Sequence, residues 1–269
     1  MDKGAIFRKL HEAPGAFVIP NPWDVGTAKL LASFGFKALA TTSAGFAFSH
    51  GLPDGGVPFD MMISHCKAVV GASDLPVSAD LERGKGDSPE SAGETIFAAQ
   101  AAGLAGCSIE DYTDDPSNPI YDFSLAVERV AAAAEAARAL HNDFVLTARA
   151  ENFLHGRPDL DDTIARLQAF EQAGADVLYA PGLSDLATVR KVCSALSKPV
   201  NVLAIPGFTV AALADAGASR ISLGSKLTTY AFGMLQRASH EMLDQGTFEF
   251  SRDCMPYGML QDMFSPDNA

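Results

Sequence analysis

Short β-like runs alternate with longer, alanine-rich helical patterns along this chain, and few architectures accept such an order. The order is typical of parallel strands joined by right-handed helical crossovers. Helical candidates include Val25–Phe34, Pro89–Ala102 and Phe123–Leu140, and the strand candidates are Phe17–Asp24, Ala38–Gly45, Pro76–Glu82, Gly106–Asp111, Phe144–Ala150, Val177–Gly182, Pro199–Ala204 and Arg220–Ser225. This count favours an α/β fold built as a single (β/α)8 TIM-type barrel over an open doubly wound sheet.

The junctions between predicted helices and the strands that follow them share one sequence pattern. In SFGFKAL, AAGLAGC, QAGADVL and DAGASRI, a helix stops at a glycine and the next strand begins. At a helix start, Ser88, Pro89 and Glu90 have the order of an N-cap, a first-turn proline and a first-turn acid. Because the strands between these junctions differ in chemistry, the pattern indicates recurrent βα units and not a solenoid.

A barrel of this type accounts for the whole length of 269 residues, so we expect one domain over 1–269. An amphipathic stretch, Leu227–Leu243, follows the last strand candidate, and residues 246–269 form a tail rich in Phe and Met. The apolar side chains of this tail need a surface to cover. Either the tail packs on its own barrel, or it packs on a neighbouring subunit.

Composition limits the partners and the compartment. The net charge is −13 and no dense Lys/Arg cluster occurs, which argues against nucleic acid or an anionic membrane as a partner. The four cysteines are widely spaced, as in a protein that keeps reduced thiols. The start lacks the apolar core of a signal peptide, and no apolar run could span a membrane. We therefore expect a cytoplasmic protein. An acidic protein can bind an acidic substrate where a metal ion or converging cations reverse the local potential.

Carboxylates dominate the ends of the predicted strands, where barrels of this type place their functional groups. Alternation along PVSADLERGKG puts Asp80 and Glu82 on one side of a strand, and Glu110 ends the next strand. Three converging carboxylates repel one another, and a divalent cation such as Mg²⁺ relieves the repulsion. We expect Asp80 to bind the ion directly and Glu82 and Glu110 to act through water. The alternative is that these acids cap helices or are solvated.

Other polar groups lie at the same end of the predicted barrel. Arg149 ends the fifth strand and offers a bidentate fork to a substrate carboxylate or phosphonate, or a salt bridge to Glu151 or Glu110. Ser43, Ala44 and Gly45 can present a hydroxyl and backbone N–H groups to an anion. His50 and His155 lie in loops near the predicted mouth, where a solvated side chain is the commoner state, and neither is assigned a role.

At these residues the sequence resembles the isocitrate lyase/phosphoenolpyruvate mutase superfamily. The stretches that carry the resemblance are NPWDVGTAKLL, TTSAG, PVSADLERGKG, SIED, TARAENF and PVNVL, in family order and at family-like spacing. The resemblance implies Mg²⁺-dependent cleavage or formation of C–C or P–C bonds beside a 2-oxo acid, through an enolate, with Mn²⁺ as the alternative ion. Metal and arginine would stabilise the charge that develops.

The resemblance also implies roles for single residues. Asp80 matches the principal metal ligand, Glu82 and Glu110 the supporting carboxylates, and Asp54 an additional acid near the metal. Arg149 matches the anion-binding arginine, the segment 43–45 falls where the family holds the substrate carboxylate, and Asn201 is a weaker match. The family exchanges its last helix between subunits, which implies a homodimer or homotetramer.

Two departures bear on the reaction. Glu82 stands where many members have aspartate, and the loop DYTDDPSNPIYDF lacks the Lys-Lys/Arg-Cys-Gly-His motif of the lyases. Tyr112, Asn118 or a water would then supply the proton. We expect a Mg²⁺-dependent lyase or decarboxylase acting on a small anionic 2-oxo or 2-hydroxy (di)carboxylic acid. One alternative is P–C bond hydrolysis or rearrangement on a phosphonopyruvate-like substrate, for which Asn118 has a suitable offset but Pro116 occupies the lysine place. The other is a non-catalytic binder of 2-oxo acids.

Overall fold

The computed structural model of the protein describes residues 2–265 and contains one sheet of eight parallel strands. The strands are β1 (Phe17–Ile19), β2 (Leu39–Ala40), β3 (Val77–Asp80), β4 (Gly106–Glu110), β5 (Val145–Arg149), β6 (Val177–Tyr179), β7 (Val200–Leu203) and β8 (Arg220–Ser222). Their order is β1-β8-β7-β6-β5-β4-β3-β2. The Ala40 amide donates to the Pro20 carbonyl at 3.0 Å, which brings the two edge strands together and nearly closes the barrel. The predicted (β/α)8 fold is confirmed.

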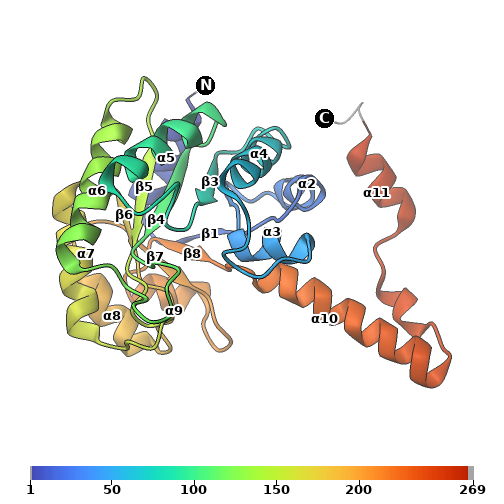
Figure 1. The fold of residues 1–269 in the computed structure, drawn as a ribbon. Coiled ribbons are helices and arrows are strands. Elements are labelled where there is room, and N and C mark those ends of the chain that lie inside the picture. Colours follow the sequence, from blue (N-terminus) through green and yellow to red (C-terminus); the bar gives the residue numbers. More distant parts are fainter. Residues whose placement is uncertain (1, 266–269) are drawn as a thin grey trace.

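Helices surround the strands, as Figure 1 shows. They are α1 (Lys3–Glu12), α2 (Val25–Ser33), α3 (Ser43–Ser49), α4 (Phe59–Val70), α5 (Pro89–Ala101), α6 (Phe123–Arg138), α7 (Leu160–Ala173), α8 (Leu186–Ser194), α9 (Val210–Asp215), α10 (Lys226–His240) and α11 (Tyr257–Phe264), with a π-helical turn at Glu241–Gln245 and a 3-10 helix at Glu249–Asp253. The helices predicted after the first, third and fourth strands are confirmed to within two residues at each end. Ser88 caps α5, because its hydroxyl accepts from the Ser91 amide at 3.2 Å.

Several strands are shorter than predicted. The run Ala38–Gly45 was expected to be one strand, but β2 ends at Ala40 and α3 begins at Ser43. Thr42 ends the extended segment, because its hydroxyl accepts from the Gly45 amide at 3.1 Å and caps the new helix. The residues that follow a short strand are therefore free to turn toward the barrel mouth.

Apolar and polar residues alternate along the strands in a way that positions the site. Val200, Val202 and Ile221 are buried in the apolar layer between strands and helices. Asn201 and Ser222, which alternate with them, face a cavity inside the barrel. The barrel interior is thus largely polar, and its groups require hydrogen-bond or ionic partners.

The amino-terminal end of the barrel is closed by α1, a helix that was not predicted from the sequence. Phe7 of this helix is fully buried beside Val145 and Val177. Arg8 joins the helix to the barrel through ion pairs with Asp143 and Asp176, each at 2.7 Å. The opposite, carboxyl-terminal end stays open.

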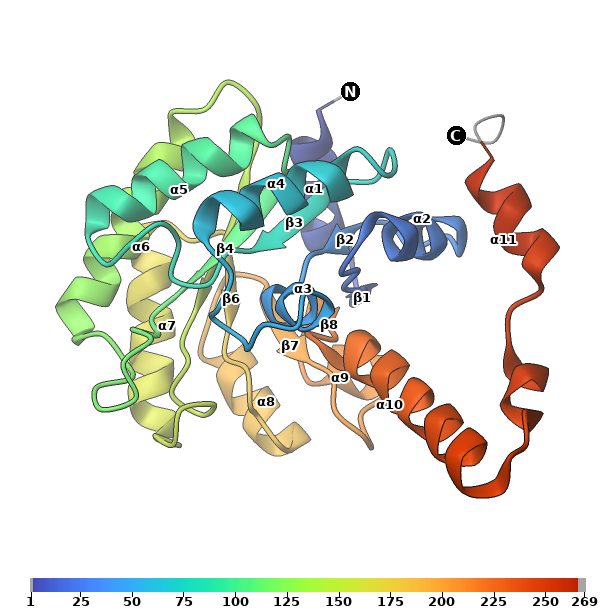
Figure 2. The same ribbon diagram turned by 45° about the vertical axis from the view of Figure 1, so that its right-hand side comes forward.

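The C-terminal arm (residues 226–265) leaves the barrel along α10 and returns through α11, as the turned view in Figure 2 makes plain. It carries exposed apolar side chains, among them Leu235 at 61% and Leu243 at 83% exposure. It touches its own barrel again at α2, where Ser33 Oγ lies 3.9 Å from Met263 Sδ. Residues 266–269 of the predicted tail lie outside the described residues. None of the helices within residues 2–265 combines the length and apolarity that a bilayer crossing requires.

Candidate active site

A cavity of about 520 Å³ opens at the carboxyl-terminal ends of the strands. Barrel enzymes place their chemistry at this end. Most of the residues predicted from the sequence line the cavity, namely Ser43, Ala44, Asp54, Asp80, Glu82, Glu110, Tyr112, Arg149 and Asn201. The structure therefore brings together groups that lie far apart in the chain.

Arg149 binds three carboxylates in this cavity. Its Nη1 lies 2.6 Å from Asp80 Oδ1, its Nη2 3.0 Å from Glu110 Oε2, and its Nε 2.8 Å from Glu151 Oε1. Both salt-bridge partners that the sequence suggested for Arg149 are present, and Asp80 is a third. Three of the five N–H donors of the guanidinium are used, so two remain for a ligand.

The charges of this cluster do not balance. Burial alone would lower the pKa of Arg149, but Glu110, Glu151 and Asp80 outweigh that effect and raise the pKa well above its usual value. Burial, reinforced by Glu151 and Asp80 and opposed by Arg149, raises the pKa of Glu110 well above its usual range. Three carboxylates against one guanidinium leave room for a further cation.

Asp80 is oriented by residues that follow the neighbouring strand β2. Its Oδ2 accepts from the Ser43 hydroxyl at 2.8 Å and from the Ser43 amide at 3.2 Å. The Thr41 hydroxyl accepts from the Asp80 amide at 3.0 Å and fixes the backbone. In this structure both donors of Ser43 therefore serve Asp80, so Ser43 contributes by holding the carboxylate in place.

Glu82 reaches the cavity in a different way from the one expected. Strand β3 ends at Asp80, and Glu82 adopts a left-handed backbone with φ of 53°. The turn, and not strand alternation, aims its side chain at the cavity. Such a conformation is rare in a residue other than glycine and is often found at functional sites. Burial and the nearby Asp80 and Asp54 raise the pKa of Glu82 to about 7.

These acids fit a hydrated divalent cation. Within residues 2–265, no three His, Cys, Asp or Glu side chains converge closely enough to enclose a metal ion, and Arg149 bridges Asp80 and Glu110. Mg²⁺ does not need such an enclosure, because it commonly keeps several waters and uses one or two carboxylates. Asp80, Glu82 and Asp54 face one cavity and share excess negative charge, which is the donor chemistry that Mg²⁺ prefers.

Two predicted site residues do not line the cavity. Gly45 lies inside α3, where a Cβ atom would collide with Thr42 and with Thr228 of α10, so its small size serves helix packing. Asn118 lies exposed at the tip of the loop after β4, and its carbonyl accepts from the Thr113 hydroxyl at 2.6 Å. The expected contact is therefore not formed at the cavity wall by Gly45 or Asn118, because both lie away from the cavity lining.

The loop after β4 is a hairpin across one side of the cavity. Tyr112 pairs with Ile120 in an antiparallel bridge, and the Thr113 amide donates to the Pro119 carbonyl at 2.9 Å. This pairing carries the tip outward with Asn118, while Tyr112 and Asp114 face the cavity. No pattern in the sequence predicted the hairpin.

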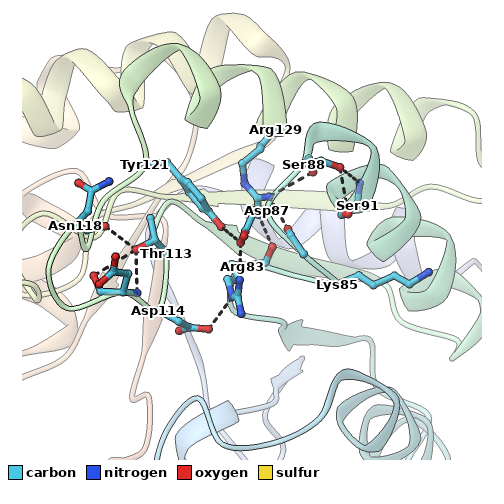
Figure 3. A network of polar contacts seen from close by, with 12 residues as sticks. Arg83, Lys85, Asp87, Ser88, Ser91, Thr113, Asp114, Asn118, Tyr121 and Arg129 are labelled. Atoms are coloured by element: carbon cyan, nitrogen blue, oxygen red, sulfur yellow. Dashed lines mark hydrogen bonds and ion pairs between the residues drawn. The ribbon is translucent and has the colours of Figure 1, made fainter.

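Polar contacts from the loop after β3 anchor this hairpin, as Figure 3 shows. Arg83 Nε donates to Asp114 Oδ2 at 2.6 Å, and the Tyr121 hydroxyl donates to Asp87 Oδ1 at 2.6 Å. The buried Arg129 donates to the backbone carbonyls of Arg83 and Gly86. Asp114 has a left-handed φ of 63°, and its ion pair helps to stabilise that conformation.

His155, for which the sequence predicted no role, lines the cavity. Its ring stacks on Tyr112 with centroids 3.8 Å apart and an interplanar angle of 8°. Its Nε2 lies 3.6 Å from Glu151 Oε2. The spacing of four residues between Glu151 and His155, just after a strand end, is the signal that could have identified the pair.

Comparisons with known proteins show a matching family model and similar solved structures. The family model described as phosphoenolpyruvate phosphomutase matches residues 7–243. A protein from Burkholderia cenocepacia J2315, provisionally assigned as a lyase/mutase, is 51% identical, and its crystal structure superposes with a TM-score of 0.96 over 99% of this chain and 97% of the other. An uncharacterised protein from Mycobacterium tuberculosis (strain CDC 1551 / Oshkosh) is 30% identical over 95% of this chain and 94% of its own.

A relative with a named activity is 2,3-dimethylmalate lyase from Eubacterium barkeri. It is 25% identical over 262 residues, which cover 92% of this chain and 86% of the relative. A crystal structure of a 2,3-dimethylmalate lyase is 26% identical and superposes with a TM-score of 0.87, over 99% of this chain and 96% of the other.

Proposed function

Because the chain belongs to the phosphoenolpyruvate phosphomutase family, within the isocitrate lyase/phosphoenolpyruvate mutase superfamily, we propose that it is a Mg²⁺-dependent lyase. It cleaves a C–C bond of a small 2-oxo or 2-hydroxy (di)carboxylic acid through an enolate. The observation that carries this proposal is the cluster in which Arg149 meets Asp80, Glu110 and Glu151 inside the cavity. In this cluster the guanidinium of Arg149 can bind the carboxylate of the substrate, and the neighbouring acidic side chains can bind a metal ion.

Asp80 would hold the ion directly, and Glu82, Glu110 and Asp54 would hold its waters. When bound, Mg²⁺ (or Mn²⁺) would act as a Lewis acid that stabilises the negative charge developing on the oxygen of the substrate. Ser43 keeps Asp80 oriented through two hydrogen bonds. Ala44, next to Ser43, lines the cavity and would lie against the carboxylate of the substrate.

Arg149 would bind and orient the substrate. Its two unused N–H groups can donate to a carboxylate, while Glu110 and Glu151 fix the plane of the guanidinium. Because that guanidinium is largely buried, its hydrogen bonds are screened less by water. Charge that grows during C–C cleavage is therefore stabilised by a group that is already in position.

The cleavage needs one proton removed and one delivered. In a 2-hydroxy acid a carboxylate of the cavity takes up the hydroxyl proton and the C–C bond breaks, so that the hydroxyl carbon leaves as the carbonyl of an oxo product. The electron pair of the broken bond forms an enolate on the other fragment, which then takes up a proton at carbon. We assign this delivery to Tyr112, whose phenol faces the cavity against the ring of His155, or to a water next to it. The hairpin that carries Tyr112 takes the place of the cysteine loop of the lyases.

P–C bond hydrolysis or rearrangement on a phosphonopyruvate-like substrate is the second candidate. It is supported by the family model, which is described as a phosphomutase. The guanidinium fork of Arg149 suits a phosphonate as well as a carboxylate. Release of phosphate or isomerisation of phosphonopyruvate, followed by ³¹P NMR, separates this candidate from the first.

Proton NMR tests the proposal. The purified protein is incubated with Mg²⁺ and, separately, oxaloacetate, 2-methylisocitrate, isocitrate, 2,3-dimethylmalate or phosphonopyruvate, each against an EDTA control and an Asp80→Ala protein. Metal-dependent loss of one of the acids other than phosphonopyruvate, abolished in the Asp80→Ala protein, supports the lyase. Saturable binding without conversion of any acid would instead support a non-catalytic binder of 2-oxo acids.

We also propose an assembly and a compartment. The exposed apolar side chains of the C-terminal arm would pack on a second copy, as a homodimer or homotetramer, through exchange of the last helices. All four cysteines are free thiols in the structure, which supports a reducing cytoplasm.

A further inference from the structure

Arg220, the first residue of β8, is a buried cation whose neighbours are all neutral. Only 5% of the residue is exposed. Its Nε donates to Asn201 Oδ1 at 2.8 Å, its Nη2 donates to Thr147 Oγ1 at 3.1 Å, and its Nη1 lies 3.3 Å from His11 Nε2. None of the ion pairs described within residues 2–265 involves Arg220, whereas Arg149 has three such partners.

The histidine beside Arg220 does not supply the missing negative charge. His11 Nδ1 lies 2.9 Å from the Phe7 carbonyl, which can only accept, so the proton is assigned to Nδ1 and Nε2 accepts from Arg220. Burial, and then Arg220, lower the pKa of His11 to about 3. The imidazole is neutral, and the positive charge of Arg220 remains uncompensated.

Arg220 faces the same cavity as Arg149. The strand register pairs Glu110 with Arg149, Arg149 with Tyr179, Tyr179 with Asn201, and Asn201 with Arg220. Residues in register share one face of a sheet, so these side chains form a continuous row inside the barrel, and each of them lines the cavity. The two arginines are three strands apart, roughly 14 Å along the curved sheet and less across the barrel.

A structural role does not account for the charge. A neutral amide could bond to Asn201 and Thr147 without the cost of burying an ion that has no counter-ion. Two of the five N–H donors of Arg220 remain unused. Next to it, Ser222 Oγ accepts from Asn201 Nδ2 at 2.9 Å, so the hydroxyl proton of Ser222 is left for the phenol of Tyr179 or for a ligand. The unused N–H groups of Arg220 are donors, as an anion requires.

We propose that Arg220, with Ser222 and with Asn201 as its positioning residue, forms a second anion subsite that receives the distal acid group of a dianionic substrate. The inference rests on the proposed function, which places the reacting end of the substrate at Arg149 and Asp80. It narrows the substrate class to short dicarboxylic 2-oxo or 2-hydroxy acids. A monocarboxylic acid would leave the Arg220 charge buried without compensation.

Binding of two matched acids tests this subsite. Malate and 2-hydroxybutyrate differ only by a carboxylate in place of a methyl group, and each is titrated calorimetrically into the Mg²⁺-loaded protein at fixed ionic strength. Wild-type protein should bind malate at least about tenfold more tightly than 2-hydroxybutyrate. Arg220→Gln should remove that preference and leave the affinity for 2-hydroxybutyrate unchanged, whereas Arg220→Lys should keep part of it.

Other outcomes would overturn the subsite. One is equal affinity of the wild-type protein for malate and 2-hydroxybutyrate. Another is a folded Arg220→Gln protein that still prefers malate, and a third is an Arg220→Gln protein that loses affinity equally for both acids. If circular dichroism shows that Arg220→Gln does not fold, Ser222→Ala removes a single hydroxyl and should weaken malate binding alone. Failure of the lyase proposal is distinguishable, because Asp80→Ala should weaken metal-dependent binding of both acids, and absence of turnover leaves the calorimetric preference intact.

Discussion

Arg149 Nη1 lies 2.6 Å from Asp80 Oδ1, so the residue proposed to hold the substrate anion is paired with the residue proposed to hold the metal. A cation that binds Asp80 competes with this ion pair, and an anionic substrate offers Arg149 a replacement partner. Metal and substrate should therefore bind cooperatively. The metal takes Asp80 away from Arg149, and the substrate anion gives Arg149 a new partner. The first two predictions follow from this relationship.

Asp80→Asn keeps the size of the side chain and removes its charge. Because a neutral amide is a poor ligand for a hard divalent ion, we expect Mg²⁺-dependent turnover to fall by about 10³-fold. The stabilisation of the folded protein by Mg²⁺, measured as a shift in Tm, should disappear as well. Asp60→Asn, at an exposed position in the first turn of α4, is the matched control and should match the wild type in both measurements. A Tm shift retained by Asp80→Asn would contradict the assignment.

Arg149→Met removes the cation from between buried carboxylates. Glu110 and Glu151 are 8% and 1% exposed, and without Arg149 their charges lack a counter-ion. We expect the free energy of unfolding at pH 7 to fall by about 3–5 kcal/mol, as when one partner of a buried ion pair is deleted. Urea denaturation measures the change. Adding Glu110→Gln to the same protein should restore part of the loss, and a double variant as unstable as the single one would argue against this origin.

The buried His11 makes the stability of the fold depend on pH. Its pKa is lowered to about 3 in the folded protein, mainly by burial, while the unfolded chain titrates near pH 6.5. Between these values the unfolded state binds more protons, so stability is complete above about pH 6.5 and falls with decreasing pH, by about 2 kcal/mol at pH 5 for this histidine. His65, whose pKa burial lowers to about 4, acts in the same direction. His11→Gln should flatten the dependence of the urea midpoint on pH, and parallel curves for the two proteins would refute the contribution of His11.

The ion pair between Arg83 and Asp114 should affect catalysis more than stability. Both side chains are about one-third exposed, so breaking the pair should cost less than about 1 kcal/mol of unfolding free energy. The hairpin would lose the contact that helps to position Tyr112, and Arg83→Gln should lower kcat/KM about tenfold. Lys85→Gln is the matched control, because Lys85 lies in the same loop but pairs with Glu94 of α5 at 2.6 Å. Equal effects of the two substitutions would remove the basis for this prediction.

The sequence was sufficient to predict site residues that lie at the ends of strands. Asp80, Glu110 and Arg149 each end a strand, so the barrel rule alone predicts that they meet. It failed where position depends on local backbone geometry or on register. Glu82 reaches the cavity through a left-handed turn, and Asn118 is carried outward by a hairpin. Arg220 is the first residue of its strand, whereas the barrel rule concerns only the carboxyl-terminal ends of strands. Its place in the cavity follows from the pairing of β7 with β8.

The C-terminal arm supplies the last prediction. Leu235 and Leu243 are 61% and 83% exposed within one chain, so replacing them by aspartate removes little of the chain's own packing. If the arm packs on a second copy, light scattering should give the wild type a mass of at least two chains of 28.3 kDa. The double Leu235→Asp, Leu243→Asp protein should then dissociate toward the mass of one chain, because charges buried in an apolar interface lack partners. Phe97→Asp, at a side chain 51% exposed on α5, is the control that should keep the wild-type mass. A wild-type mass equal to one chain would show that the arm has another role.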